Sequence, residues 1–336
     1  MSITKLLTPI ALVLLLTTGS AAHAITLKIA TQAPDGTTWM KDMRSAAKEI
    51  AEKTDGRVKI KYYPGGVMGN YKSVMKKIRL GQLHGGAVTG DSLVDIYPEM
   101  RTYSLPMLFN SYAEVDYVRA KVDPDLVKGM QDKGFTILGI TEGGFAYLMS
   151  NGPVRSIADL KSHKLWIPED DPLNEALFRK MGVNPITLPL SDVYTGLQTG
   201  LIDTIGATPA GALAFQWHTR IKNITEVPLL YLVGVLVVDN KRFNRIKPAD
   251  QTIIKEVVAR VFSEMNEKNR KDNAKADDAL KNLGIEYVRP EKAEEARWRK
   301  LADEVIAEIG ITRDSNETFR KVDSLLKEFK SQQASN

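Results

Sequence analysis

The segment 159–209 constrains the fold most, because short apolar runs alternate in it with helices that have clear start and stop signals. Its first apolar run, 165–167, stops at a proline. Asp171-Pro172 then supplies an N-cap and a first-turn proline for a helix that a glycine closes. A second run, 185–189, precedes a helix expected from Ser191, which again ends at a glycine. This βαβα order predicts an open, mostly parallel sheet with ligands beyond the carboxyl ends of its strands.

Periodicity extends this α/β pattern to the rest of the chain. Alternating or apolar runs predict strands, and apolar residues at helical spacing predict helices. The strands are expected at 25–30, 57–63, 85–89, 135–140 and 145–149, and the helices at 37–54, 71–80, 291–308 and 317–329, with a much longer one from Pro248.

The first 24 residues have the pattern of a signal peptide. Lys5 precedes the apolar run 10–16, and small residues ending in Ala22-His23-Ala24 predict cleavage after Ala24. The run is much shorter than the roughly 20 apolar residues that span a membrane. We therefore expect an exported, periplasmic protein that begins near Ile25.

Composition excludes several classes of function. Without Lys5 the chain carries 45 Lys and Arg against 41 Asp and Glu, with both signs interleaved. Such interleaving is typical of a solvated surface, so we expect no nucleic-acid partner. The chain has no Cys and therefore no disulfide or cysteine nucleophile. It also lacks HxH, HExxH, GxSxG and a Gly-rich phosphate loop, so we expect no enzyme, metal site or cofactor.

Several motifs resemble the substrate-receptor subunits of TRAP transporters, extracytoplasmic receptors of the dicarboxylate-binding (DctP) type. They are DLK..K.W.P, a GVNP turn, SDVYTGLQTGLID with the following TP, YYPGGVMG at 62–69 and LPMLF at 105–109. The resemblance runs through nearly the whole chain after residue 24. It implies a two-lobed periplasmic solute-binding fold, in which each lobe is a mixed β-sheet flanked by helices. A cleft would separate the lobes, and a long helix would span both.

Strands that return to a first lobe after the second has been built require crossovers, which form a hinge. The apolar run 227–238 is long enough to cross between lobes. The helix from Pro248 has a buried first half and a polar second half, as expected of a strut. We assign 25–145 and 233–270 to lobe I, and 146–232 and 271–336 to lobe II.

The resemblance draws attention to one position in the cleft. In most of the family the strand after DLK carries an arginine that holds a substrate carboxylate, and the aligned residue here is Trp166. An indole has one donor and no charge, so it cannot replace the guanidinium fork. Trp166 is either a core residue or an aromatic wall of the cleft.

Two other segments lack the polar residues that bind ligands in the family. Phe145 and Tyr147 lie where binders of acidic sugars carry a second arginine. A later segment offers only hydroxyls, such as that of Thr208, and is followed by Phe215 and Trp217. Either these are plain sheet and core residues, or together they form an apolar cleft.

The remaining candidates are less specific. Glu169 follows the Trp166 strand together with two further acids, which suit either a helix N-terminus or a bound amine or cation. Tyr194 and Gln198 lie one turn apart on one helix, where helix–sheet packing is the alternative role. Gln32 and Met68 lie in loops after the first strands, close to where an α/β cleft is expected.

We expect a receptor that closes on a small organic ligand, apolar or aromatic, and delivers it to the membrane subunits of a TRAP permease. One alternative is an organic acid held by another basic residue, such as Arg101 or Arg155. A second is an amine held by Trp166 with Glu169 or Asp170. A hydrolase or lyase in the same cleft is the alternative from another class. The sequence is compatible with a monomer or a homodimer.

Overall fold

The computed structural model describes residues 24–169, 171–312 and 316–334. The predicted signal peptide lies outside the described residues apart from Ala24. Within these ranges no helix combines the length and the apolar character needed to cross a membrane.

Lobe I, the part built on the first three strands, begins with parallel pairing. β1 (Ile25–Thr31) pairs in parallel with β2 (Val58–Tyr63) and with β3 (Gly85–Thr89). The connections are α1 (Thr38–Lys53) and α2 (Tyr71–Arg79), whose first turns are capped by side chains of Thr37 and Asn70. Right-handed crossovers of this kind place the loops after β1 and β3 at one edge of the sheet.

Two long strands join the lobes. β4 (Phe135–Ser150) pairs antiparallel with β9 (Leu230–Asp239), and β9 pairs antiparallel with β3. The two strands expected at 135–140 and 145–149 are a single strand, because bulges bend β4 without ending its pairing with β9. The sheet order is β10-β8-β4-β9-β3-β1-β2, with β7 on β4. The added strands are β7 (Thr204–Ala207), β8 (Asn223–Thr225) and β10 (Glu286–Val288).

Lobe II, the part built around the second half of β4, also contains a two-stranded parallel sheet. β5 (Trp166–Pro168) pairs with β6 (Ile186–Leu188), in agreement with the βαβα pattern. Short helices connect the strands of both lobes. They are η1 (Gly90–Leu93), η2 (Pro98–Ser104), α4 (Ile157–Leu160), α5 (Pro172–Lys180), η3 (Leu190–Asp192), α6 (Val193–Thr199), α7 (Pro209–Ala214), η4 (Trp217–Arg220) and α8 (Asn240–Phe243).

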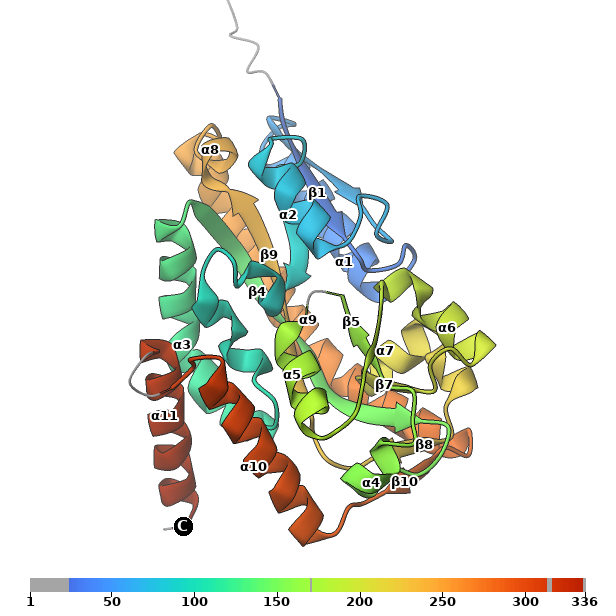
Figure 1. Ribbon diagram of the computed structural model, residues 1–336. Helices are drawn as coiled ribbons and strands as arrows, with labels where there is room; N and C mark the ends of the chain where they lie inside the picture. The colour runs from blue at the N-terminus through green and yellow to red at the C-terminus, as the bar shows by residue number, and fades with distance from the viewer. Residues whose placement is uncertain (1–23, 170, 313–315, 335–336) are drawn as a thin grey trace, which may run out of the picture.

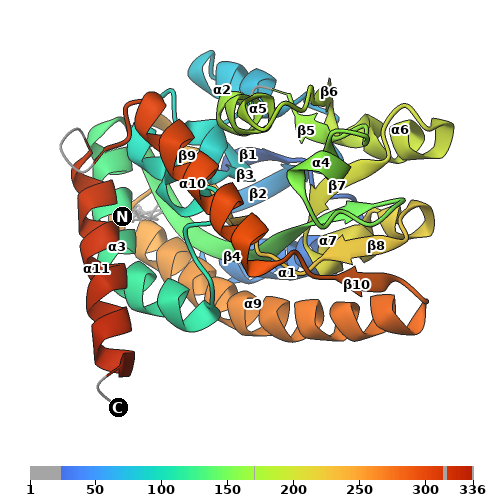
Figure 2. The same cartoon turned by 60° about the horizontal axis from the view of Figure 1, so that its bottom comes forward.

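One helix spans both lobes, as the sequence predicts. α9 (Pro248–Asn282) has 35 residues and lies along the lower edge of the molecule in Figure 2, beneath β4. Its first half buries an apolar stripe that includes Ile254, Val258 and Phe262 against lobe I. Its second half contacts α7 of lobe II. The two lobes therefore share two strands and one long helix.

The last two helices belong to different lobes. α10 (Lys292–Glu308) packs on α5 of lobe II, whereas α11 (Glu317–Ala334) packs on α3 (Tyr112–Asp132) of lobe I. Figures 1 and 2 both show α11 beside α3. This corrects the expected range 271–336 for lobe II, because Val322, Leu325 and Leu326 bury their side chains in the lobe I core. The other lobe boundaries stay a proposal.

Candidate functional site

A cleft of about 1560 Å³ lies between the lobes. Lobe I lines it with the loops that follow β1 and β3 and with the start of α2. Lobe II lines it with the segments that follow β5 and β7, and β4 and β9 form its floor. The cleft therefore lies at the carboxyl ends of parallel strands, where the sequence predicts it.

Three aromatic rings form one wall of the cleft. The rings of Phe215 and Trp217 stack with centroids 4.8 Å apart, and Trp217 meets Trp166 edge to face at 5.7 Å. Trp166 is only 5% exposed, and its indole N–H donates a 3.0 Å hydrogen bond to the carbonyl of Leu188. Trp166 therefore packs in the lobe II core and also lines the cleft.

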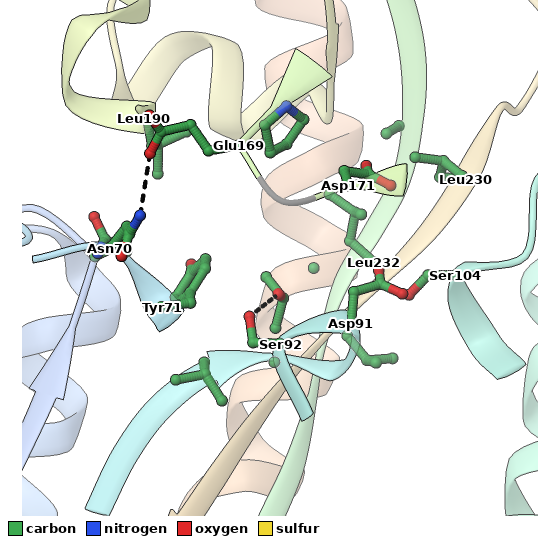
Figure 3. Close-up of a pocket in the computed structure, with 18 of the residues that line it drawn as sticks. Asn70, Tyr71, Asp91, Ser92, Ser104, Glu169, Asp171, Leu190, Leu230 and Leu232 are labelled. Carbon is green, nitrogen blue, oxygen red and sulfur yellow. Dashed lines mark hydrogen bonds between the residues drawn. The ribbon is translucent and has the colours of Figure 1, made fainter. Parts of the chain in front are cut away.

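Another part of the cleft is polar, and it is called the polar end below. Asp91 lies in η1 directly after β3, Arg101 lies in η2, and Asp171 caps α5. Arg101 Nε is 3.8 Å from Asp91 Oδ1, and this buried Nε has no hydrogen-bond partner among the described residues. Figure 3 shows Asp91 beside Ser104, with Asp171 above them.

The pKa values of the two carboxyl groups at this end are both raised. Burial among protein atoms, together with the charge of Asp171, raises the pKa of Asp91 to about 7. The Asp91 side chain is still 39% exposed to the open cleft, and water there limits the effect. Burial also raises the pKa of Asp171. Hydrogen bonds from Asn174 and the charge of Arg101 lower this pKa and so offset part of the increase.

One hydrogen bond connects the lobes across the cleft opening. Asn70, the cap of α2, donates through Nδ2 to Glu169 Oε2 at 3.1 Å. Figure 3 shows these two side chains pointing toward each other from opposite lobes. This is a direct side-chain contact between the two lobes.

The floor of the cleft contains a buried ion network at the bulge of β4. Glu142 is 4% exposed and accepts hydrogen bonds from Arg119 Nη1 at 3.1 Å and from Arg270 Nε at 2.7 Å. The backbone N–H of Glu142 donates to Asn266 Oδ1, and its carbonyl accepts from Asn269 Nδ2. α3, β4 and α9 are thus joined where the lobes meet.

Six of the predicted ligand-binding residues line the cleft, and five do not. Those that line it are Gln32, Trp166, Glu169, Thr208, Phe215 and Trp217. Two of them also have local roles, since Gln32 Nε2 donates to the Gly69 carbonyl and Thr208 Oγ1 caps α7. Those that the structure places elsewhere are Met68, Phe145, Tyr147, Tyr194 and Gln198.

The direction of each side chain explains the five residues outside the cleft. Phe145 packs on Tyr112 and Tyr231 in the lobe I core, and Tyr147 points to the same side of β4. Their neighbours Ala146 and Leu148 line the cleft instead, because successive strand residues face opposite sides. Met68 packs against the lobe I core and Tyr194 against the lobe II core. Gln198 is exposed to solvent.

The polar end was only partly anticipated. Asp91 follows a buried strand directly, so the topological rule that selects Gln32 also selects Asp91. Asp171 is recognisable from the sequence as a helix cap, and this role alone explains an Asp there without a position in the cleft. Of the two alternative arginines, Arg101 lines the cleft and Arg155 does not.

No group of three or more potential metal ligands occurs among the described residues.

Comparison with known proteins identifies the family. The chain matches the family described as bacterial extracellular solute-binding protein, family 7 (DctP), over residues 29–312. It is 26% identical over 245 residues to the 2,3-diketo-L-gulonate-binding periplasmic protein of Escherichia coli K12, covering 71% of this chain and 73% of that protein. It is 28% identical over 281 residues to the C4-dicarboxylate-binding periplasmic protein of Rhodobacter capsulatus, covering 80% and 83%.

A solved structure agrees in fold. The TRAP periplasmic solute-binding protein of Xanthobacter autotrophicus Py2, crystallised with β-D-galacturonate, superposes with a TM-score of 0.81 at 19% identity. The match covers 90% of this chain and 99% of that one, which confirms the expected two-lobed α/β fold. The chain therefore belongs to the DctP family of bacterial extracellular solute-binding proteins, the solute receptors of TRAP transporters, which is a family of receptors and not of enzymes.

Proposed function

We propose that this protein is the receptor for an organic solute with an apolar or aromatic body, which it delivers to the membrane subunits of a TRAP permease. The observation that carries the proposal is the wall formed by Trp166, Trp217 and Phe215. Within it, Trp166 stands where the resemblance to the family implies an arginine. A ring or a branched chain gains favourable contact against such a wall.

The segments that carry this wall argue against a carboxylate there, although the lobe I side of the lining contains Lys72, Lys76, Arg79 and Arg101. No Lys or Arg stands in the segments 204–219 and 165–171, which form the wall and its neighbours. A carboxylate buried without a cation or several hydrogen-bond donors is strongly unfavourable. The floor adds further apolar surface from β9, through Leu230 and Leu232.

Closure of the lobes gives such a receptor its affinity. Lobe I and lobe II each supply part of the lining, so the full set of ligand contacts forms only when both lobes meet. A ligand that binds the closed form better raises the population of that form. The contact between Asn70 and Glu169 is positioned to strengthen as the cleft narrows.

A specific observation favours one second candidate, a receptor for a small hydrophilic organic acid. The relatives named above bind diketogulonate, C4-dicarboxylates or galacturonate, all of which are acids. Arg101 lines the cleft, and its Nε has no hydrogen-bond partner among the described residues. Against this candidate, Asp91 already provides a counter-charge 3.8 Å from that nitrogen.

A thermal-shift screen of residues 25–336 tests the proposal. One panel contains small hydrophilic acids, and the other contains aromatic and aliphatic molecules with varied head groups. A ligand at about one hundred times its dissociation constant stabilises the fold by about 2.7 kcal/mol. We expect shifts in the second panel, and shifts confined to the first panel would favour the organic-acid receptor.

A variant pair tests whether the aromatic wall contacts the ligand. Phe215→Ala removes the half-buried outer ring of the wall, whereas Gln198→Ala alters an exposed residue outside the cleft. We expect weaker binding only for Phe215→Ala. Equal affinities of both variants would exclude the wall as a ligand surface. Mass spectrometry of the ligand after incubation distinguishes binding from turnover by a hydrolase or lyase.

The proposed setting of this receptor is the periplasm. We propose that cleavage after Ala24 releases the mature protein, which the mass of the exported protein tests directly. The relatives from E. coli and R. capsulatus are named as periplasmic proteins. Light scattering of the mature protein with and without ligand distinguishes a monomer from a homodimer.

A further inference from the structure

We propose that the ligand carries a protonated amino group, which binds between Asp91 of lobe I and Asp171 of lobe II. The inference rests on the proposed function, because it concerns the polar end of the same cleft. It assigns a chemical class to the head group of the solute, whereas the aromatic wall concerns its body.

Both carboxyl groups are positioned to accept hydrogen bonds from a ligand. Asp91 and Asp171 line the cleft from different lobes, and Figure 3 shows Asp171 above Asp91. Asp171 accepts from the N–H of Asn174 at 3.1 Å and from its Nδ2 at 2.7 Å. A carboxylate offers about four acceptor positions, so each Asp retains acceptors for a further donor.

Besides the Arg101 guanidinium, whose Nε is a donor without a partner among the described residues, this end of the cleft contains a buried acceptor without a partner. Asn174 is 6% exposed, and its Oδ1 has no hydrogen-bond partner among the described residues. A buried acceptor without a donor is uncommon in folded proteins and requires an explanation. Together with two carboxylates it forms a surrounding that an ammonium group, with three donors and no acceptor, complements.

The charges point to the same class of ligand. The charges that act on this pair include Arg101 as the cation and Glu175 as an additional acid. Once both carboxyl groups are ionised, two carboxylates face one guanidinium at this end, whereas the other cations of the lining, Lys72, Lys76 and Arg79, lie on α2. A ligand carboxylate beside Arg101 would also lie close to Asp91, only 3.8 Å from that guanidinium nitrogen. An ammonium group meets opposite charge from both lobes.

This arrangement couples the charge of the ligand to closure. Asp91 and Asp171 belong to different lobes, so closing an empty cleft brings two like charges together. A cation between them converts that repulsion into attraction on both sides. A ligand can shift the open–closed equilibrium only through such a difference in affinity between the two states.

Three matched series of probes test the inference with the mature wild-type protein. Each series keeps one body and changes only the head group from ammonium to carboxylate to hydroxyl. The bodies are phenylethyl (2-phenylethylamine, 3-phenylpropionate, 2-phenylethanol), indolylethyl (tryptamine, indole-3-propionate, tryptophol) and octyl (octylamine, octanoate, octanol). Dissociation constants come from calorimetry, and we expect the ammonium member to bind at least about tenfold more tightly than its partners.

Two variants identify the residues that act on the amine. Asp91→Asn and Asp171→Asn each remove one charge, and asparagine keeps the capping role that Asp171 has on α5. We expect each variant to weaken amine binding about tenfold or more, since hydrogen bonds to charged groups are the stronger ones. The control Glu256→Gln removes an exposed charge on α9 outside the cleft lining and should leave the affinity within about twofold of wild type.

The outcomes separate this inference from the proposed function. Binding that favours carboxylates or alcohols in the series would overturn the amine inference and leave the apolar-bodied solute in place. Amine binding that survives both Asp variants would also overturn it. If no body in any series binds, the proposed function itself fails, and the inference fails with it.

Discussion

Substitution of Glu142 by Gln tests whether a buried ion network fixes the junction of the two lobes. Gln has nearly the same shape as Glu and removes only the charge. Glu142 is 4% exposed and lies against Arg119, itself 9% exposed, and against Arg270. The substitution therefore leaves two guanidinium groups without their shared carboxylate.

The expected loss of stability follows from the partners that remain. Breaking a buried ion pair by removing one partner costs roughly 3–5 kcal/mol. Arg119 keeps Asp123 at 2.8 Å, and Arg270 keeps Asp116, so we expect the lower end, about 3 kcal/mol. With an unfolding entropy of about 2.1 cal/mol/K per residue, such a loss corresponds to a fall in Tm of roughly 5 °C for a chain of this size.

Urea unfolding followed by circular dichroism measures this difference. Asp116→Asn is the matched control, because its side chain is 56% exposed and its contact with Arg270 lies at the surface. Surface pairs contribute at most about 1 kcal/mol, so the control should lose far less stability. A loss for Glu142→Gln no larger than that of the control would refute the reasoning.

Three further predictions concern the cleft and the strand β4 that forms part of its floor. Trp166→Phe removes the donor to the Leu188 carbonyl at 3.0 Å, so the free energy of unfolding should fall by about 1–3 kcal/mol; an unchanged urea midpoint would contradict this. Gly144→Ala, at φ +99 and with a Cβ 2.8 Å from Asn273 Nδ2, should cost about 1–3 kcal/mol in the same assay, and wild-type stability would count against it. The raised pKa of Asp91, about 7 when folded against about 4 when unfolded, means that the folded state binds more protons between these pH values. Its contribution to stability should therefore fall as pH rises from about 4 to about 7, so the Tm profiles of wild type and Asp91→Asn should diverge there, and parallel profiles would disprove it.

Much of the fold could be predicted from the sequence because local signals and packing agree. The helix from Pro248 carries an apolar stripe in one half only, and the structure places that half on lobe I. The partner of α11 could not be predicted. Its pattern shows that Val322 and Leu326 are buried, but an amphipathic stripe does not say which helix covers it.

Residues that directly follow a strand were predictable as part of the candidate site, whereas Met68, five residues beyond the end of β2, was not. Gln32, Glu169 and Thr208 follow the ends of strands, and all three line the cleft. Phe145 and Tyr147 were placed there on the resemblance, yet they face the core. β4 is buried on both sides, so its sequence has no polar–apolar alternation from which a facing direction could be read.

The pairing of β9 has a consequence for the order in which the chain acquires structure. Gly85 in β3 pairs with Val238, and Phe135 in β4 pairs with Asp239, so the centre of the sheet joins segments far apart in sequence. Such long-range closure carries a large entropy cost and is slow. A nascent chain can form β1, α1 and β2 early, but it lacks the strand between β3 and β4 until residue 239 is available. We therefore expect a fragment that ends before β9 to remain without a native core, and both lobes to become stable in one late cooperative step.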